Sequence, residues 1–321
     1  MIKRCSALAV VLLLSLLACR EVEAQPAKVV SVVEKEVRLN GDIQIVVDDL
    51  GILLKNNPAG KQPPLLPFVN GYAMKGSTLR YIDQESKTLR FNLARNPSDS
   101  GSREAWTHIL GGLGPFKRTH RVSLGTEDTG PIASDQTVVF EVYPSPWSQI
   151  AIVLLILLVI AFLVLVFKTD ILKDPKEEGT GERTYSLGRF QMAFWFLIIL
   201  GSFTYIWMVT GDLAMPETSL VLMGISGATA LGAILVKPNP KKPESRKKST
   251  LWRFFVELLG NGEDQITLHR FQMFAWTMIL GLTFIAGVFN QLAQPVLDSS
   301  LLTLMGISSG MYVGFKFPEK S

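Results

Sequence analysis

Residues 150–167 form eighteen consecutive positions without a polar side chain, and this run constrains the fold more than any other feature of the sequence. A helix of about 20 apolar residues crosses the hydrocarbon core of a bilayer, so the run predicts a first transmembrane helix at residues 148–168. Further apolar stretches predict four more spans, at residues 190–209, 219–236, 271–289 and 299–315. We therefore expect an α-helical transmembrane bundle of five spans.

The first 24 residues have the features of an export signal. A basic start precedes a short apolar stretch at residues 7–18, which is too short for a comfortable membrane span. Two processing outcomes stay open: a lipobox-like sequence that ends at Cys19 and implies lipid attachment there, or ordinary cleavage after Ala24. Either outcome exports residues 25–145.

The exported segment, residues 25–145, alternates short apolar runs with turn residues, which is typical of an antiparallel β sandwich. We expect strands at residues 29–33, 43–47, 89–93, 121–124 and 138–142. Asn70-Gly71 predicts a tight hairpin, residues 83–87 a second turn, and residues 105–110 a helix of one or two turns that Gly111 ends. The layout is immunoglobulin-like in architecture, without the cysteine and tryptophan framework of true immunoglobulin domains.

The residues that most enzymes and metal sites need are scattered along the chain. They are His108, His120 and His269, with both cysteines, Cys5 and Cys19, inside the signal segment. Asp48-Asp49 is interpreted as a solvated strand end, and no triad order or glycine-rich phosphate loop is found in the sequence. The net charge of +4 forms no basic face. We therefore expect a non-enzymatic protein without metal, cofactor or nucleic-acid partner.

Lysine and arginine are distributed unevenly among the connections between the predicted spans. Residues 168–189, 237–270 and 316–321 contain five, eight and two of them, whereas residues 210–218 and 290–298 contain none. Positive residues are retained on the cytoplasmic side during insertion. The counts predict a bacterial cytoplasmic (inner) membrane protein with its β domain outside and its carboxyl terminus in the cytoplasm.

The membrane region contains an internal repeat. Residues 186–192 recur at residues 267–273, an offset of 81, and a tryptophan follows the glutamine by four residues in each copy. Residues 222–226 match residues 304–308 at an offset of 82. We therefore expect a duplicated two-helix hairpin whose copies enter from the same side, as parallel repeats related by an axis near the membrane normal.

This repeat divides the membrane region into segments. A cytoplasmic loop at residues 169–188 precedes repeat 1 at residues 189–237, and a basic linker with an amphipathic helix at 238–269 precedes repeat 2 at 270–321. The apolar face predicted at residues 251–259 indicates a helix that lies in the membrane interface or docks on a partner.

The repeated motif marks the membrane boundary of each hairpin. Its members are Arg189, Gln191 and Trp195 in the first copy and Arg270, Gln272 and Trp276 in the second. Ser186 and Thr267 fit as N-caps of the two helices. We expect the arginines to extend to lipid headgroups and the glutamines to form interhelical hydrogen bonds just inside the membrane.

The second helix of each hairpin carries small residues four positions apart. They are Gly224, Ala228 and Gly232 in repeat 1 and Gly306, Gly310 and Gly314 in repeat 2. Such stripes let helix backbones approach closely. Two readings stay open: packing of the hairpins within one chain, or a seam between subunits. Charged residues lie only at the ends of the predicted spans, which argues against an ion-coupled transporter.

The chain resembles a set of uncharacterised bacterial membrane proteins whose helical hairpin opens with Ser-Leu-x-Arg-x-Gln-Met and closes with a Gly-Ile-Ser helix. Here the motif lies at residues 186–195 and 224–226, with Thr267 and His269 as departures in the second copy. The resemblance implies no activity.

Two functions are consistent with the sequence. The first is an exported β module that binds an envelope ligand or scaffolds a partner, on a helical anchor that contacts lipids and associates with further copies or another membrane protein. The alternative is an oligomeric channel or mechanically gated pore formed by the glycine-rich repeats.

Overall fold

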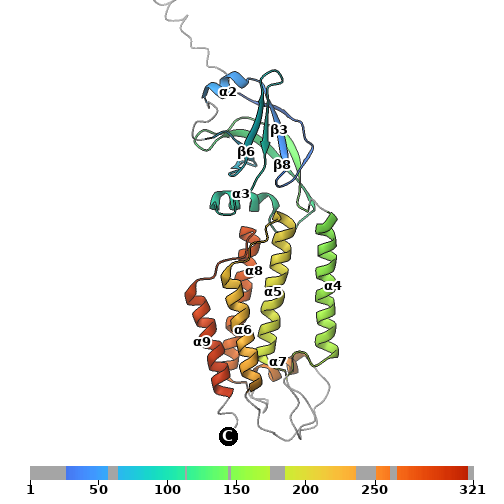
Figure 1. Cartoon of the computed structure of the whole chain (residues 1–321), viewed down its shortest axis with the longest axis vertical. Coiled ribbons are helices and arrows are strands. Elements are labelled where there is room, and N and C mark those ends of the chain that lie inside the picture. Colours follow the sequence, from blue (N-terminus) through green and yellow to red (C-terminus); the bar gives the residue numbers. More distant parts are fainter. Residues whose placement is uncertain are drawn as a thin grey trace, which may run out of the picture.

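The structure is a computed structural model that describes residues 27–56, 64–112, 114–143, 146–173, 185–235, 251–260 and 266–316. The expected signal segment with Cys19 and most of the basic linker lie outside these residues. A β region is stacked on one end of a set of long helices, with the short helix α3 (Ser100–Leu110) between the two (Figure 1).

The strands of the described residues form two sheets. The first has the order β1 (Val29–Val32), β3 (Asp42–Val47), β7 (Thr88–Asn92), β6 (Thr78–Asp83), and all its pairs are antiparallel. The second has the order β2 (Glu36–Val37), β10 (Thr137–Glu141), β8 (Lys117–Thr126), β4 (Leu66–Val69), β5 (Tyr72–Ala73), with β9 (Gly130–Pro131) beside β8. Because β2 pairs with β10 in parallel, the expectation of a purely antiparallel arrangement is wrong at this pair.

One hydrophobic core joins the two sheets. Alternate side chains of β3 and β7, such as Ile43 and Phe91, meet Val122 of β8 and Phe140 of β10 in this buried cluster. The five strands expected from alternation are confirmed to within a few residues at their ends.

Local signals position the turns and the helix of the β domain. Asn70 and Gly71 both have positive φ angles, of 50° and 86°, so the expected tight hairpin between β4 and β5 is confirmed. The helix expected at residues 105–110 begins earlier, because the Asp99 side chain accepts from the Gly101 amide and caps it. The short helix α2 (Leu50–Asn56) was not expected.

Among the described residues, four helices are long and apolar enough to cross a membrane. They are α4 (Pro146–Lys168), α5 (Leu187–Thr210), α6 (Glu217–Leu235) and α8 (Leu268–Gln291). The fifth predicted span is a helix too, α9 (Ser299–Lys316), but its eighteen residues include glycine, serine and threonine positions that lower its hydropathy. The count of five spans is therefore supported for four helices.

The two hairpins form a bundle of four helices. Helix α5 packs against α6 and α8, and α9 packs against the same two helices, so the bundle closes into a ring. Helix α4 contacts α5 and lies outside the four-helix bundle, to the right of α5 in Figure 1. At the end of the bundle away from the β domain, the amphipathic helix α7 (Leu251–Leu259) buries Leu258 against Leu187 and Met273, so its apolar face docks on the chain's own bundle.

Candidate functional site

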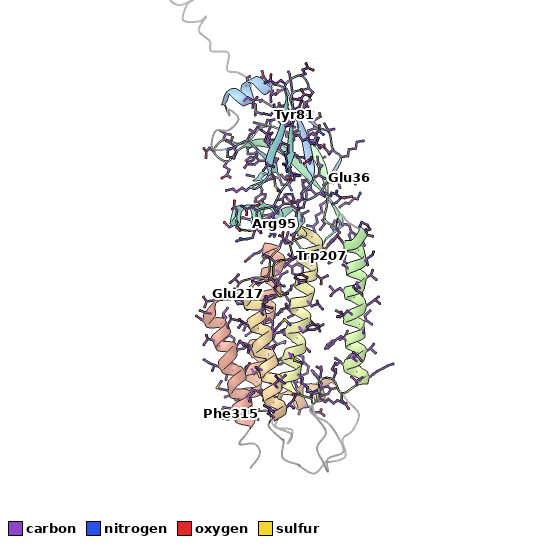
Figure 2. All side chains as sticks on the ribbon, in the orientation of Figure 1. Glu36, Tyr81, Arg95, Trp207, Glu217 and Phe315 are labelled. Atoms are coloured by element: carbon purple, nitrogen blue, oxygen red, sulfur yellow. The ribbon has the colours of Figure 1, made fainter. Side chains whose placement is uncertain are left out.

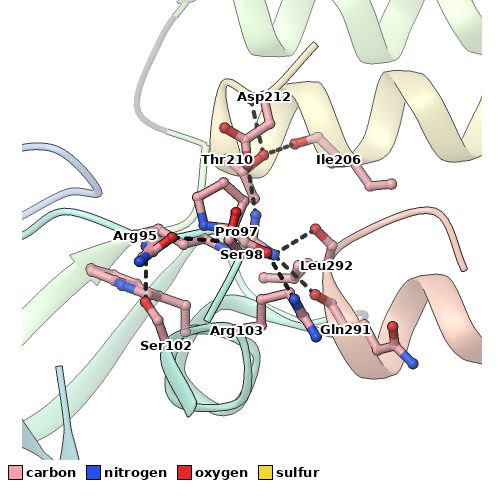
Figure 3. Close-up of polar contacts among 12 residues, drawn as sticks. Arg95, Pro97, Ser98, Ser102, Arg103, Ile206, Thr210, Asp212, Gln291 and Leu292 are labelled. Carbon is pink, nitrogen blue, oxygen red and sulfur yellow. Dashed lines mark hydrogen bonds and ion pairs between the residues drawn. The ribbon is translucent and has the colours of Figure 1, made fainter. Parts of the chain in front are cut away.

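The clearest constellation of charged and polar groups lies where the β domain meets the bundle. Arg95 follows β7 and reaches the ends of both repeated helices (Figure 3). One terminal nitrogen lies 2.6 Å from Oδ2 of Asp212, just beyond α5. The other donates to the carbonyl oxygens of Gln291 and Leu292, at the end of α8, over 3.0 Å each. A single side chain thus joins the β domain to both repeats.

The surroundings of Arg95 stabilise its positive charge. Its side chain is 4% exposed, while that of Asp212 is 37% exposed, so water reaches the carboxylate and largely misses the guanidinium. Burial lowers the pKa of Arg95, and the charge of Asp212 opposes this effect, so the side chain stays protonated at neutral pH. The carbonyl groups at a helix C-terminus carry partial negative charge, which stabilises a cation there.

Neighbouring bonds fix the backbone that carries Arg95. The indole nitrogen of Trp106 donates to the Ala94 carbonyl over 3.3 Å, and the Asn96 amide donates to the Ser102 hydroxyl over 2.9 Å. That hydroxyl in turn donates to the Lys75 carbonyl. The arginine is therefore held from both sides in a segment anchored to α3.

Apolar contacts continue across the same junction. Val209 of α5 and Leu292, directly after α8, belong to the buried cluster that fills the β domain. Leu292 has a φ of 44°, a left-handed conformation that costs a residue with a Cβ about 1 kcal/mol or more. The strain is compatible with a buried side chain that docks on the β core. The buried core of the β domain consequently extends to the ends of α5 and α8.

In the first repeat, Gln191 and Trp195 of the boundary motif point into the interior of the helical bundle, near the start of α5. Gln191 is fully buried, and its amide nitrogen lies 3.4 Å from the Ser309 hydroxyl and 3.5 Å from the Met305 sulfur. Trp195 packs edge-on against Phe284 of α8, with ring centroids 6.1 Å apart. The expected interhelical role of Gln191 is thus seen, in contacts between the two repeats.

The second copy of the motif occupies a different environment. Gln272 and Trp276 are partly exposed. Arg270 is buried, with its guanidinium 5.6 Å from the ring centre of Tyr312, so it does not take the expected exposed position toward headgroups. Arg189 is half-buried and donates to the Ile171 carbonyl over 3.3 Å.

Ser186 and Thr267 occupy the expected N-cap positions with extended backbones. Within the described residues their side chains make no capping hydrogen bond. Their backbone amides instead donate to the Leu172 and Leu259 carbonyls, over 2.8 and 3.1 Å. Isolated bridges pair Lys173 with Tyr185 and Gly260 with Ile266. The structural repeat therefore extends to residues that precede the sequence motif, although the sequences of these preceding segments differ.

The small residues are divided between an internal contact and an open face. A Cβ added at Gly232 would lie 3.0 Å from a methyl group of Val313, so this glycine serves packing between α6 and α9. Added at Gly224, Gly306, Gly310 or Gly314, it would meet no atom of the described chain within 4 Å. Ala228 is exposed as well. Most of the two stripes thus face away from the chain's own bundle.

A second polar link between the repeats was missed by sequence reasoning. Gln294, in the connection between α8 and α9, is buried, and its carbonyl oxygen accepts from the Ser219 hydroxyl of α6 over 2.8 Å. Its amide nitrogen donates to the Ile199 carbonyl of α5 over 3.3 Å. Only the proximity of these loops in the fold reveals it.

The remaining candidates have structural surroundings. His108 stacks on Tyr72, with ring centroids 4.3 Å apart. Burial lowers the pKa of His120, which contacts Asn70 over 2.7 Å. Asp48 accepts from the Lys28 amide and Asp49 from the Ile52 amide, so the acidic pair caps local backbone groups.

Within the described residues, no group of three or more histidine, cysteine, aspartate or glutamate side chains could hold a metal ion. Comparisons of the chain with protein families, with curated proteins and with solved structures find no match.

Proposed function

We propose that this chain is a non-enzymatic envelope protein whose exported β module, of immunoglobulin-like architecture, binds or scaffolds a ligand on an oligomerising helical anchor. In this proposal the N-terminal segment directs export, with Cys19 as the residue lipidated if the lipobox is used. Helices α4, α5, α6, α8 and α9 cross the bacterial inner membrane. The β domain lies outside and the carboxyl terminus in the cytoplasm.

The observation that carries the proposal is the junction. Arg95, Val209 and Leu292 couple the β domain directly to the ends of both repeats. A flexible tether would be enough to hold an independent domain at the membrane, whereas buried contacts to the ends of both α5 and α8 fix the direction in which the β module faces. Such a mounting suits a module that presents one surface to a partner at a set height above the membrane.

The best candidate for that surface is the edge of the first sheet opposite β1. Strand β6 forms this edge, and Tyr81 on it is exposed, in the part of the β domain away from the helices (Figure 2). An exposed edge strand can pair with an added strand from a partner, and a neighbouring aromatic side chain adds contact area. We expect the ligand to be an extended protein segment.

Site-specific photocrosslinking in cells tests this surface. A photoreactive amino acid at Tyr81 should give a discrete adduct with one envelope protein, and Arg80→Pro, which removes a backbone N–H donor at the bulge of this edge strand, should abolish it. The matched control is the same photoreactive residue at Ile150, which is exposed on α4. Adducts that are equal at both positions, or that survive the proline substitution, would contradict the proposal.

The alternative is an oligomeric channel or mechanically gated pore. The outward position of Gly306, Gly310 and Gly314 favours it, because helices of further copies could approach there. Trp195 and Phe284 fill the centre of one bundle, so a pore would have to lie between chains. Reconstituted protein should then conduct ions under voltage or membrane tension, and the absence of conductance would argue against this function.

A further inference from the structure

The two repeats lie side by side. Helix α5 is next to its repeat equivalent α8, and α6 is next to its equivalent α9 (Figure 1). A two-fold axis through the bundle would instead place each helix diagonally opposite its equivalent. The two hairpins therefore use different faces at their contact, and each repeat has one face that the other repeat does not cover.

The first helices carry this difference in their exposure. Met273 of α8 is fully buried, whereas its equivalent in α5, Met192, is 44% exposed. Thr277 and Phe196 are an equivalent pair of the same kind, buried in α8 and exposed in α5. The face that repeat 2 turns toward repeat 1 is thus open on repeat 1.

In the second helices the difference is reversed: residues of repeat 1 are buried and their equivalents in repeat 2 are exposed. Ala233 of α6 is buried and its equivalent Phe315 is exposed. Ile225 is partly buried against the bundle core, whereas its equivalent Ile307 is 58% exposed. The face that repeat 1 turns toward repeat 2 is thus open on repeat 2, and it includes the unoccupied position at Gly314, the equivalent of Gly232.

One contact shows how these faces fit. Gly232 of α6 receives Val313 of α9, and a Cβ built on the glycine lies 3.7 Å from the Val313 Cβ. The equivalent of Gly232 is Gly314, which is exposed, and the equivalent of Val313 is Leu231, which is 65% exposed. The chain therefore contains one contact of this type, between Gly232 and Val313. The equivalent glycine, Gly314, and the equivalent apolar side chain, Leu231, are both exposed, one on each repeat.

We infer that a second copy of this chain docks head-to-tail on the bundle, so that Gly314 of one copy receives Leu231 of the next as Gly232 receives Val313 within a chain. The inference deepens the proposed oligomerising anchor and rests on it. The interface is heterologous: two different faces meet, and successive copies form a ring or an open array. Met192, Phe196 and Leu231 are exposed with α4 in place, so this helix leaves them accessible to the neighbour.

Disulfide crosslinking between differently tagged full-length chains in membrane vesicles tests the inference. In a background with Cys5 and Cys19 replaced by serine, one chain carries Gly314→Cys and the other Leu231→Cys. An internal positive control is Gly232→Cys with Val313→Cys in one chain, because their Cβ separation of 3.7 Å suits a disulfide, which needs about 3.8 Å. The negative control pairs Leu231→Cys with Leu282→Cys, an exposed position of α8.

The inference predicts a disulfide-linked dimer with both tags, absent when either variant is present alone, and a ladder of higher species when one chain carries both substitutions. Two results would overturn it: no dimer although the internal control forms its disulfide, or equally strong dimers from a single variant, which would indicate a two-fold interface. Failure here leaves adducts at Tyr81 unaffected, so it is distinguishable from failure of the β module as a binding surface.

Discussion

Replacing Arg95 by methionine should release the β domain from the helices. Methionine keeps most of the apolar stem and removes the charged donors, so the change isolates the polar part of the junction. Asp212 would lose its ion pair, and the carbonyl oxygens of Gln291 and Leu292 would lose their donor.

The cost can be worked out from exposure. Because Asp212 is 37% exposed, its ion pair contributes about 1 kcal/mol, the upper end for solvent-accessible pairs. The exposed Gln291 carbonyl regains water at little cost, whereas the part-buried Leu292 carbonyl loses a bond to a charged donor worth about 1.5 kcal/mol or more. Together these contributions destabilise the junction by about 2.5 kcal/mol.

Hydrogen exchange in nanodiscs measures this opening at the helix ends. The Gly211 amide bonds to the Trp207 carbonyl and the Leu292 amide to the Val288 carbonyl, so both report local unfolding next to Arg95. A loss of about 2.5 kcal/mol corresponds to exchange faster by about 70-fold at these amides. Asp212→Asn, which removes only the ion pair, should accelerate exchange about fivefold.

Unchanged exchange at Gly211 and Leu292 in the Arg95→Met protein would refute the reasoning, because the apolar contacts alone would then hold the junction. Leu292→Ala serves as the reference for that outcome, since it removes the buried side chain and leaves the arginine contacts possible.

Three further predictions concern the repeats and the β domain. Gly281→Ala should lower the stability of the protein in nanodiscs by about 1–3 kcal/mol, because the added methyl group overlaps the Phe194 ring at the contact between repeats. The control is Gly201→Ala, since no described atom lies within 4 Å of a Cβ added there. Equal effects of the two substitutions would contradict the close contact at Gly281. Gln191→Leu should change thermal stability by less than about 1 kcal/mol, since its bonds are long and its carbonyl oxygen has no partner in the described part of the chain; a much larger loss would show that this polar contact is essential. The hydrogen bond from the Lys28 amide lowers the pKa of Asp48 below its ordinary value of 3.8, so the stabilising effect of this bond is complete above that value and is lost as pH falls through the folded-state pKa. The protection factor of the Lys28 amide, which corrects for the intrinsic pH dependence of exchange, should fall through this step in the parent protein and show no such step in Asp48→Asn.

Features encoded by local pattern could be predicted from the sequence. The apolar run of α4, the alternation in β3 and β7 and the Asn70-Gly71 turn each depend on neighbouring residues only. The repeat was equally visible, because it needs only a comparison of the chain with itself.

Features that depend on distant partners could not be predicted. Arg95 has no unusual sequence setting, and its partners lie more than 100 residues further along the chain. Arg189 and Arg270 occupy identical motif positions and yet differ in burial, because their surroundings depend on which hairpin lies beside them. The parallel pairing of β2 with β10 likewise joins segments about 100 residues apart.

The central claim, that the β domain and the helices form one rigid unit, is tested most directly by a distance measurement within single chains. Spin labels at Tyr81 of β6 and Leu220 of α6, both exposed, report the separation in nanodiscs after dilution into unlabelled protein. The account predicts one narrow distance distribution that broadens in Arg95→Met. A broad distribution in the parent protein, as expected for domains joined by a flexible linker, would contradict it.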